Sequence, residues 1–132
     1  MIPRVPVSWG ELIDKLSILE IKTERLREPQ AIANAVSELG LLREVLAELQ
    51  APPTKLHALQ TQLGEANRRL WDTEDAIRRK EALQTFDAEF IALARAIYHT
   101  NDERSRIKRV INTLLGSSII EEKQYVGYRD GD

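Results

Sequence analysis

Two stretches of the chain repeat apolar residues every three or four positions, and a proline-containing loop separates them. The first stretch, residues 30–50, carries the seam Ile32, Ala35, Leu39, Leu42, Leu46 and Leu49. The second stretch, residues 55–82, carries the seam Leu56, Leu59, Leu63, Ala66, Leu70, Thr73 and Ile77. This spacing puts the seam of each stretch on one face of an α-helix. Because the loop "APPT" at 51–54 is short, the two seams predict an antiparallel helical hairpin.

Capping signals mark the starts of further helices. The run "SWGE" at 8–11 has the pattern of a capping box, which predicts a helix from there to about residue 27. Apolar side chains surround most of this helix, and a helix of that kind usually packs against more than one neighbour. Pro29 ends it and opens the next helix at its first turn. Thr54 is placed to cap the third helix.

The last helix is expected to begin at Asp87 and to run, straight or kinked, to about Leu115, where Gly116 follows. The polar run "HTND" at 99–102 leaves an alternative open, because its residues 100–102 are also suitable caps for a separate fifth helix. No segment shows the strict alternation of a half-buried strand. The sequence therefore predicts an all-α fold.

These helices predict an antiparallel four-helix bundle built from two long helical hairpins, with a short C-terminal appendage. A single domain accounts for residues 1–132, with an extended arm at 1–7 and a loosely structured tail at 116–132. The long seams and the nearly all-round apolar first helix offer more apolar surface than a monomer can bury. We therefore expect a homodimer.

Composition limits the kinds of partner and site. The 19 basic and 21 acidic residues give a net charge of −2 and 5% of residues are aromatic, so no nucleic-acid binding is expected. With no cysteine and two histidines, the chain is expected to use no metal and no cofactor. The N-terminus lacks the apolar segment of a signal peptide, and no apolar run is long enough to cross a bilayer. A cytoplasmic protein without membrane contact is the resulting expectation.

Three dense polar clusters interrupt the apolar seams. The first lies in the helix over 9–27 and contains Glu11, Asp14, Lys15, Glu20 and Lys22. The second lies in "LWDTEDAIRRKE" at 70–81 and contains Trp71, Asp72, Glu74, Asp75, Arg78 and Glu81. The third contains Asn101, Asp102, Arg104, Arg106, Lys108 and Asn112. A rise of about 1.5 Å per residue brings parts of all three clusters to one layer of an up-and-down bundle. This layer comprises Lys22, Trp71, Glu74 and Asn101.

The clusters predict a ligand site between the helices. A phosphate or carboxylate group would suit Arg104 and Lys108, whose charges flank the apolar stripe of their helix. The candidate ligand-binding residues are Lys22, Trp71, Glu74, Arg78, Asn101, Arg104 and Lys108. Structural interpretations stay open beside this one. Trp71 can belong to the core, Glu74 and Arg78 can be a surface ion pair, and the third cluster can pair with acids of other helices.

Two kinds of function fit such a site. The first is a non-catalytic binding or scaffold module that holds an anionic metabolite or a protein partner. The second is a small helical enzyme acting on a phosphorylated or sugar-nucleotide substrate. In that enzyme Glu74 or Asp75 would be the base, and the basic residues of the third cluster would hold the anion. Convergence of these groups in one concave site would favour the enzyme, and the sequence leaves the choice undecided.

Three segments, "SWGELIDKLSILEIK", "LWDTEDAIRRKE" and "NDERSRIKRVIN", resemble the markers of a small bacterial family of uncharacterised all-helical proteins. As patterns, the last two read LWDxEDxIRxxE and NDERxxIKRxIN. The resemblance covers most of the chain and is least distinctive over 30–50. It implies no reaction. Members of the family occur as stand-alone proteins and beside genes for tetratricopeptide or glycosyltransferase proteins, which implies a link to surface-glycan assembly.

Overall fold

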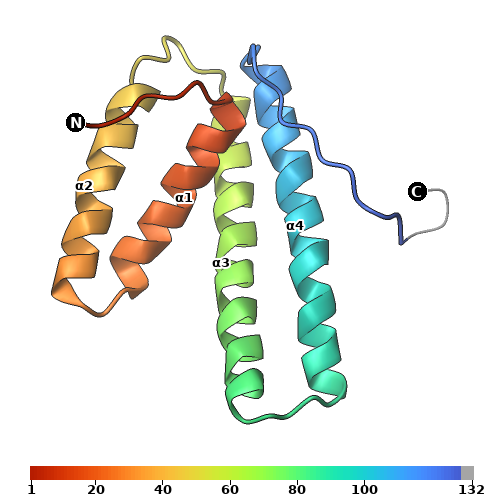
Figure 1. The fold of residues 1–132 in the computed structure, drawn as a ribbon. Coiled ribbons are helices and arrows are strands. Elements are labelled where there is room, and N and C mark those ends of the chain that lie inside the picture. The colour runs from red at the N-terminus through yellow and green to blue at the C-terminus, as the bar shows by residue number, and fades with distance from the viewer. Residues whose placement is uncertain (129–132) are drawn as a thin grey trace.

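The computed structural model describes residues 1–128, which form four α-helices and no strand (Figure 1). The helices are α1 (Trp9–Arg25), α2 (Pro29–Leu46), α3 (Lys55–Ala82) and α4 (Ala88–Leu114). α1 and α2 form one antiparallel hairpin, and α3 and α4 form a second, longer one. The predicted all-α, four-helix architecture built from two hairpins is therefore confirmed.

α1 lies between α2 and the α3–α4 hairpin, and it packs against all three of the other helices (Figure 1). Its Leu12, Leu16 and Leu19 form an apolar cluster with residues of α2. Ile13 packs on the other side with residues of α3 and α4. The prediction that this helix has several neighbours is confirmed, and its two apolar faces are the reason.

The seams of α2 and α3 do not pair with each other, so the hairpin predicted from the "APPT" loop is wrong. Within residues 1–128, α2 runs against α1 and not against α3. The helix ends at Leu46 rather than near residue 50, so the connection to α3 spans residues 47–54. This longer connection passes over the start of α1 (Figure 1). The α2 seam therefore packs mainly on one face of α1, and the proximal part of the α3 seam packs on another.

Two of the predicted helix caps are present and one is not. The amide of Glu11 donates to Ser8 Oγ at 3.1 Å, and the amide of Phe90 donates to Asp87 Oδ1 at 2.9 Å. In the described chain the side chain of Thr54 caps no amide of α3, contrary to expectation. An N-cap residue usually has extended backbone angles, which let its side-chain oxygen accept a hydrogen bond from an amide of the first turn. Thr54 already has helical backbone angles, with φ −58° and ψ −31°.

α4 continues without a break through residues 99–102, so no fifth helix begins there. It ends in a Schellman motif, in which Gly116 has a φ of +62° and the Ser117 amide donates to the Asn112 carbonyl at 2.8 Å. The positive φ favours glycine and turns the chain back along α4. Residues 117–128 then run beside α4 without helix or strand (Figure 1). The last four residues of the expected tail, 129–132, lie outside the described residues.

The distal half of the α3–α4 hairpin extends beyond α1 and α2 (Figure 1). Arg25, the last residue of α1, forms an ion pair with Asp72 of α3 and marks where this half begins. None of residues 68–106 is buried, and Leu83 and Ile91 are 75% and 58% exposed. The core of the protein therefore lies in the proximal half, where α1 packs on the hairpin.

Candidate ligand-binding cleft

Asp14 is the centre of a buried polar network that joins three helices. It lies on α1 and is 3% exposed. Its Oδ2 accepts from Arg104 Nη2 of α4 at 2.6 Å, and its Oδ1 accepts from Asn67 Nδ2 of α3 at 2.9 Å. Lys108 Nζ lies 3.5 Å from the same Oδ2. A buried carboxylate needs such partners, because an unpaired charge in a protein interior costs several kcal/mol.

Helical spacing explains why these charges meet. Glu11 and Asp14 are about one turn apart on α1, and Arg104 and Lys108 are about one turn apart on α4, so the members of each pair share a face. Lys108 Nζ reaches Glu11 Oε2 at 2.8 Å, while Arg104 binds Asp14. The first and third polar clusters therefore form two successive ion pairs between α1 and α4. This is the structural interpretation that the sequence left open for the third cluster.

Lys108 is 8% exposed and has carboxylates on several sides. Burial lowers the pKa of Lys108, but the hydrogen bond with Glu11 and the charges of Asp14 and Glu121 outweigh it, so the pKa is raised overall. The ammonium group therefore stays protonated. Lys108 acts first as a structural cation whose charge is shared among carboxylates.

α1 and α4 touch backbone to backbone at Gly10. Its amide donates to Asn112 Oδ1 at 2.7 Å, and Asn112 is 3% exposed. A Cβ at position 10 would lie 2.6 Å from the carbonyl oxygen of Lys108. Only glycine allows the two backbones to approach this closely. The contact fixes the separation of α1 and α4 next to the cleft described below.

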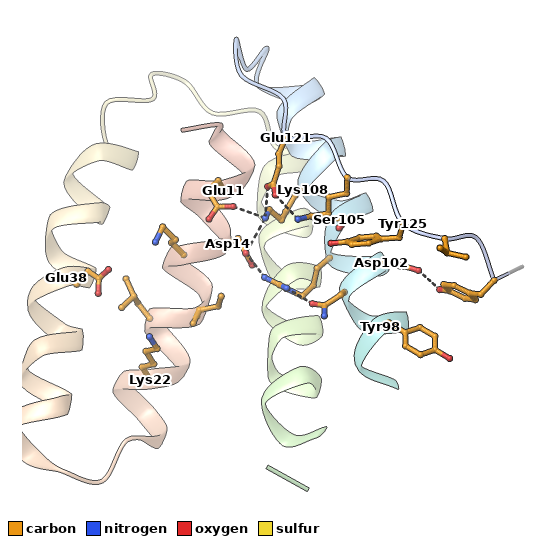
Figure 2. Close-up of a pocket in the computed structure, with 18 residues that line it drawn as sticks. Glu11, Asp14, Lys22, Glu38, Tyr98, Asp102, Ser105, Lys108, Glu121 and Tyr125 are labelled. Carbon is orange, nitrogen blue, oxygen red and sulfur yellow. Dashed lines mark hydrogen bonds and ion pairs between the residues drawn. The ribbon is translucent and has the colours of Figure 1, made fainter. Parts of the chain in front are cut away.

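A cleft of about 1000 Å³ opens between α1, α4 and the C-terminal segment (Figure 2). Representative lining residues are Lys15, Ile18 and Lys22 of α1, Tyr98, Asn101 and Ser105 of α4, and Glu121, Tyr125 and Tyr128 of the C-terminal segment. Its volume lies at the upper end of the range of small-molecule sites, about 300–1,000 Å³. The cleft is therefore large enough for a metabolite.

Two cations of the cleft differ from the others in their ion pairing. Lys15 and Lys22 form no ion pair within residues 1–128, in contrast to Arg104 and Lys108. Arg104 Nη1 donates to Asn101 Oδ1 at 2.7 Å, so the amide oxygen is occupied and the NH₂ group is the remaining donor of Asn101. Ammonium and amide donors are the groups that bind phosphate or carboxylate oxygens. The uncommitted groups of this cleft thus include a donor set suited to an anion.

The structure brings four of the seven predicted site residues to the cleft, namely Lys22, Asn101, Arg104 and Lys108. The other three, Trp71, Glu74 and Arg78, lie on α3 and do not line it. Glu74 and Arg78 form an i, i+4 ion pair at 3.5 Å, and both side chains are exposed. Trp71 is half-buried. The second polar cluster therefore does not join the other two at this place, and it contacts α1 through the Arg25–Asp72 pair.

Several residues of the network and the cleft were outside the predicted set. Asn67 follows Leu63 by four positions, so a polar residue in a core-facing position was an available signal. Gly10 was interpreted only as part of the capping box. Tyr125 and Tyr128 had no signal, because an extended segment that packs beside a helix leaves no periodic pattern in the sequence.

The fold and the cleft define a class: a small all-helical protein with a buried ion-pair network and an adjoining cleft. The chain belongs to a family of unknown function (DUF6165), whose sequence model matches residues 3–129. No curated protein and no solved structure matches the chain. The expected resemblance to an uncharacterised family is confirmed to this extent.

In the described part of the chain, none of the helices has the length and apolarity to span a membrane. Nor does that part gather three His, Cys, Asp or Glu side chains where they could hold a metal ion.

Proposed function

We propose that the protein is a binding module that holds a small anionic molecule in the cleft between α1, α4 and the C-terminal segment. The observation that carries this proposal is that Lys15 and Lys22 line the cleft without an acidic partner in the described chain. They are separated by about 10 Å along the helix axis, so they can contact two anionic groups of one ligand. Ile18 and Tyr98, which also line the cleft, provide apolar surface for the rest of such a ligand.

Arg104 and Lys108 have a supporting role in this proposal. Carboxylates of α1 compensate both cations, so they hold α1 and α4 together beside the cleft. Arg104 also orients the amide of Asn101. The direct contacts to the anion come from Lys15, Lys22 and the NH₂ group of that amide, with Lys108 at the inner end.

The arrangement gives no support to a catalytic role for Glu74. The enzyme hypothesis requires the acidic and basic residues of 70–81 to converge with the α4 residues in one concave site. Glu74 and Arg78 instead pair with each other on an exposed part of α3. We therefore propose binding as the function of the cleft and assign no reaction to it.

Replacing Lys22 with alanine should weaken anion binding at least about tenfold, because a hydrogen bond to a charged group is worth about 1.5–3 kcal/mol. Inorganic pyrophosphate is the first probe, measured by isothermal titration calorimetry at low ionic strength. Lys55→Ala is the matched control, since Lys55 is an exposed lysine at the start of α3 and does not line the cleft. Equal losses in the two variants would contradict the proposal. So would a failure of pyrophosphate and a panel of phosphate and carboxylate compounds to bind the wild-type protein.

We also propose that the protein is a homodimer joined through the distal half of the α3–α4 hairpin. None of residues 68–106 is buried, yet this stretch carries apolar side chains on both helices. A second copy packed against it would cover the distal half of the hairpin, as α1 covers the proximal half. Acidic and basic side chains are equal in number along the stretch, so two copies can face each other without an excess of like charge.

Ile91→Glu should convert this dimer into a monomer, because Ile91 is 58% exposed in the single chain and would be covered by the second copy. Light scattering at micromolar concentration would then detect the 15.1 kDa chain in place of a species of twice that mass. Val36→Glu is the control, since Val36 is 53% exposed but lies on α2. A wild-type protein that scatters as a 15.1 kDa species would exclude the dimer.

A further inference from the structure

The C-terminal segment of residues 117–128, here called the strap, forms one wall of the cleft (Figure 2). Several contacts hold it to α4, among them the following two. At its middle, Glu122 accepts two hydrogen bonds from Arg109, at 3.0 and 3.2 Å. Near its end, the hydroxyl of Tyr128 donates to the carboxylate of Asp102. The strap therefore runs along the cleft between two fixed points.

Directly before the first of these points, Glu121 places its carboxylate inside the cleft. The carboxylate lies 3.4 Å from Lys108 Nζ and 2.7 Å from Lys123 Nζ (Figure 2). The hydrogen bond from Lys123 lowers the pKa of Glu121, and the charge of Lys108 adds to this effect, while burial opposes it. The cleft thus already holds an anion between two ammonium groups, and the strap supplies it.

This carboxylate is far easier to displace than that of Asp14, which also lies close to Lys108. The side chain of Glu121 is 41% exposed, whereas that of Asp14 is 5% exposed. Asp14 belongs to a helix in the core, but the strap has no helix or strand whose hydrogen bonds would have to break. Movement of the strap therefore removes Glu121 without disturbing the ion pairs between α1 and α4.

We infer that Glu121 is a built-in competitor of the ligand: it occupies the place at Lys108 that an anionic group of the ligand takes, and the ligand displaces it. This inference rests on the binding function proposed above. The lining of the cleft contains five acidic and five basic side chains, so its charge is balanced while Glu121 is in place. Release of the Glu121 carboxylate leaves Lys108 with one neighbouring carboxylate fewer, and an anionic group of the ligand then takes that place.

Glu121→Gln and Glu122→Gln form a matched pair of variants. Each removes one carboxylate from the strap and weakens one ion pair with α4, but of the two residues only Glu121 lines the cleft. With pyrophosphate as the probe, Glu121→Gln should bind about tenfold more tightly than the wild type, because a like charge close to the anion has been removed. Glu122→Gln loosens one contact of the strap but leaves the carboxylate at Lys108 in place, so any gain in affinity should be clearly smaller than that of Glu121→Gln.

Fluorine NMR follows the strap itself. The sequence contains three tyrosines, Tyr98, Tyr125 and Tyr128, and all three line the cleft. The rings of Tyr98 and Tyr128 have centroids 5.1 Å apart, so each resonance of a 3-fluorotyrosine-labelled protein is sensitive to whether the strap is in place. Pyrophosphate should shift these resonances as it displaces Glu121. In Glu121→Gln the same shift should be complete at a pyrophosphate concentration about tenfold lower.

The outcomes separate this inference from the proposed function. Weaker binding by Glu121→Gln would mean that the carboxylate helps to hold the ligand, and it would overturn the inference. Equal affinity in the wild type and both variants would overturn it as well. The proposed function would survive either result, provided that Lys22→Ala still loses binding. If no phosphate or carboxylate compound binds the wild type or any variant, the proposed function fails and the inference fails with it.

Discussion

Replacing Asp14 with alanine is expected to lower the free energy of unfolding by about 3 kcal/mol or more, because it leaves the largely buried Arg104 without a carboxylate partner. Arg104, whose side chain is 18% exposed, loses its ion-pair partner within the described chain, and Asn67 loses a hydrogen-bond acceptor. Lys108 loses one of its nearby carboxylates. Urea denaturation followed by circular dichroism measures this change in the free energy of unfolding. The comparison requires that the free energy of unfolding falls with urea concentration at the same slope in the variant and the wild type.

Two further variants test which property of Asp14 matters. The first tests its charge against its shape, and the second tests the burial of its ion pair. Asp14→Asn keeps the volume and an acceptor for Asn67 but removes the charge, so it should lose most of the same stability. Glu24→Ala removes a surface ion pair of similar length, in which Arg68 Nη1 lies 2.7 Å from Glu24 Oε2 and the side chains are 41% and 54% exposed. Exposed pairs contribute little, so this variant should be close to the wild type. Equal losses for Glu24→Ala and Asp14→Ala would show that burial is not what makes the Asp14 network important.

Replacing Gly10 with alanine is expected to cost about 2–3 kcal/mol, because an extra methyl group does not fit between two packed backbones. The added Cβ would lie 2.6 Å from the Lys108 carbonyl oxygen and 2.8 Å from Asn112 Oδ1. A backbone oxygen cannot rotate away as a flexible side chain can, so α1 and α4 would have to separate. The loss of the buried hydrogen bond from Gly10 to Asn112 would follow.

Gly40→Ala is the matched control for this substitution. Gly40 lies inside α2, and no atom comes within 4 Å of the Cβ that alanine would add. Alanine restricts the unfolded chain and favours the helix, so this variant should gain about 0.5–1 kcal/mol. The same chemical change should thus have opposite signs at positions 10 and 40. A gain of stability in Gly10→Ala would contradict the close approach of α1 and α4.

The helices could be predicted from the sequence because their signals are local. Ser8 and Asp87 accept from amides three residues later, as the capping rules require. Which helix packs against which could not be predicted in the same way. The seams of α2 and α3 are similar leucine-rich stripes, so each is a suitable partner for the other. The outcome depends on the second apolar face of α1 and on the early end of α2 at Leu46, and neither can be judged from a seam alone.

For the candidate cleft, too, the local signals could be predicted from the sequence and the contacts between distant segments could not. Lys22, Asn101, Arg104 and Lys108 stood out as charged or polar residues beside apolar stripes, and all four line the cleft. The sequence could not distinguish cations held by carboxylates from cations available to a ligand, because the carboxylates of Arg104 and Lys108 come from a helix about 90 residues away. The strap was beyond prediction for another reason. Its place is set by single contacts such as Glu122 with Arg109, not by a repeating pattern.

The central position of α1 has a consequence for how a bound ligand would affect the stability of the protein. Lys15 and Lys22 belong to the helix that packs against every other helix. A ligand held by them would be attached to the element on which the whole fold depends, so the domain could not unfold without releasing it. Occupancy and folding would then be linked equilibria, and ligand concentration would set the melting temperature of the entire domain. In a cell, such a protein would last longer when its ligand is abundant, and its own abundance would report the level of that ligand.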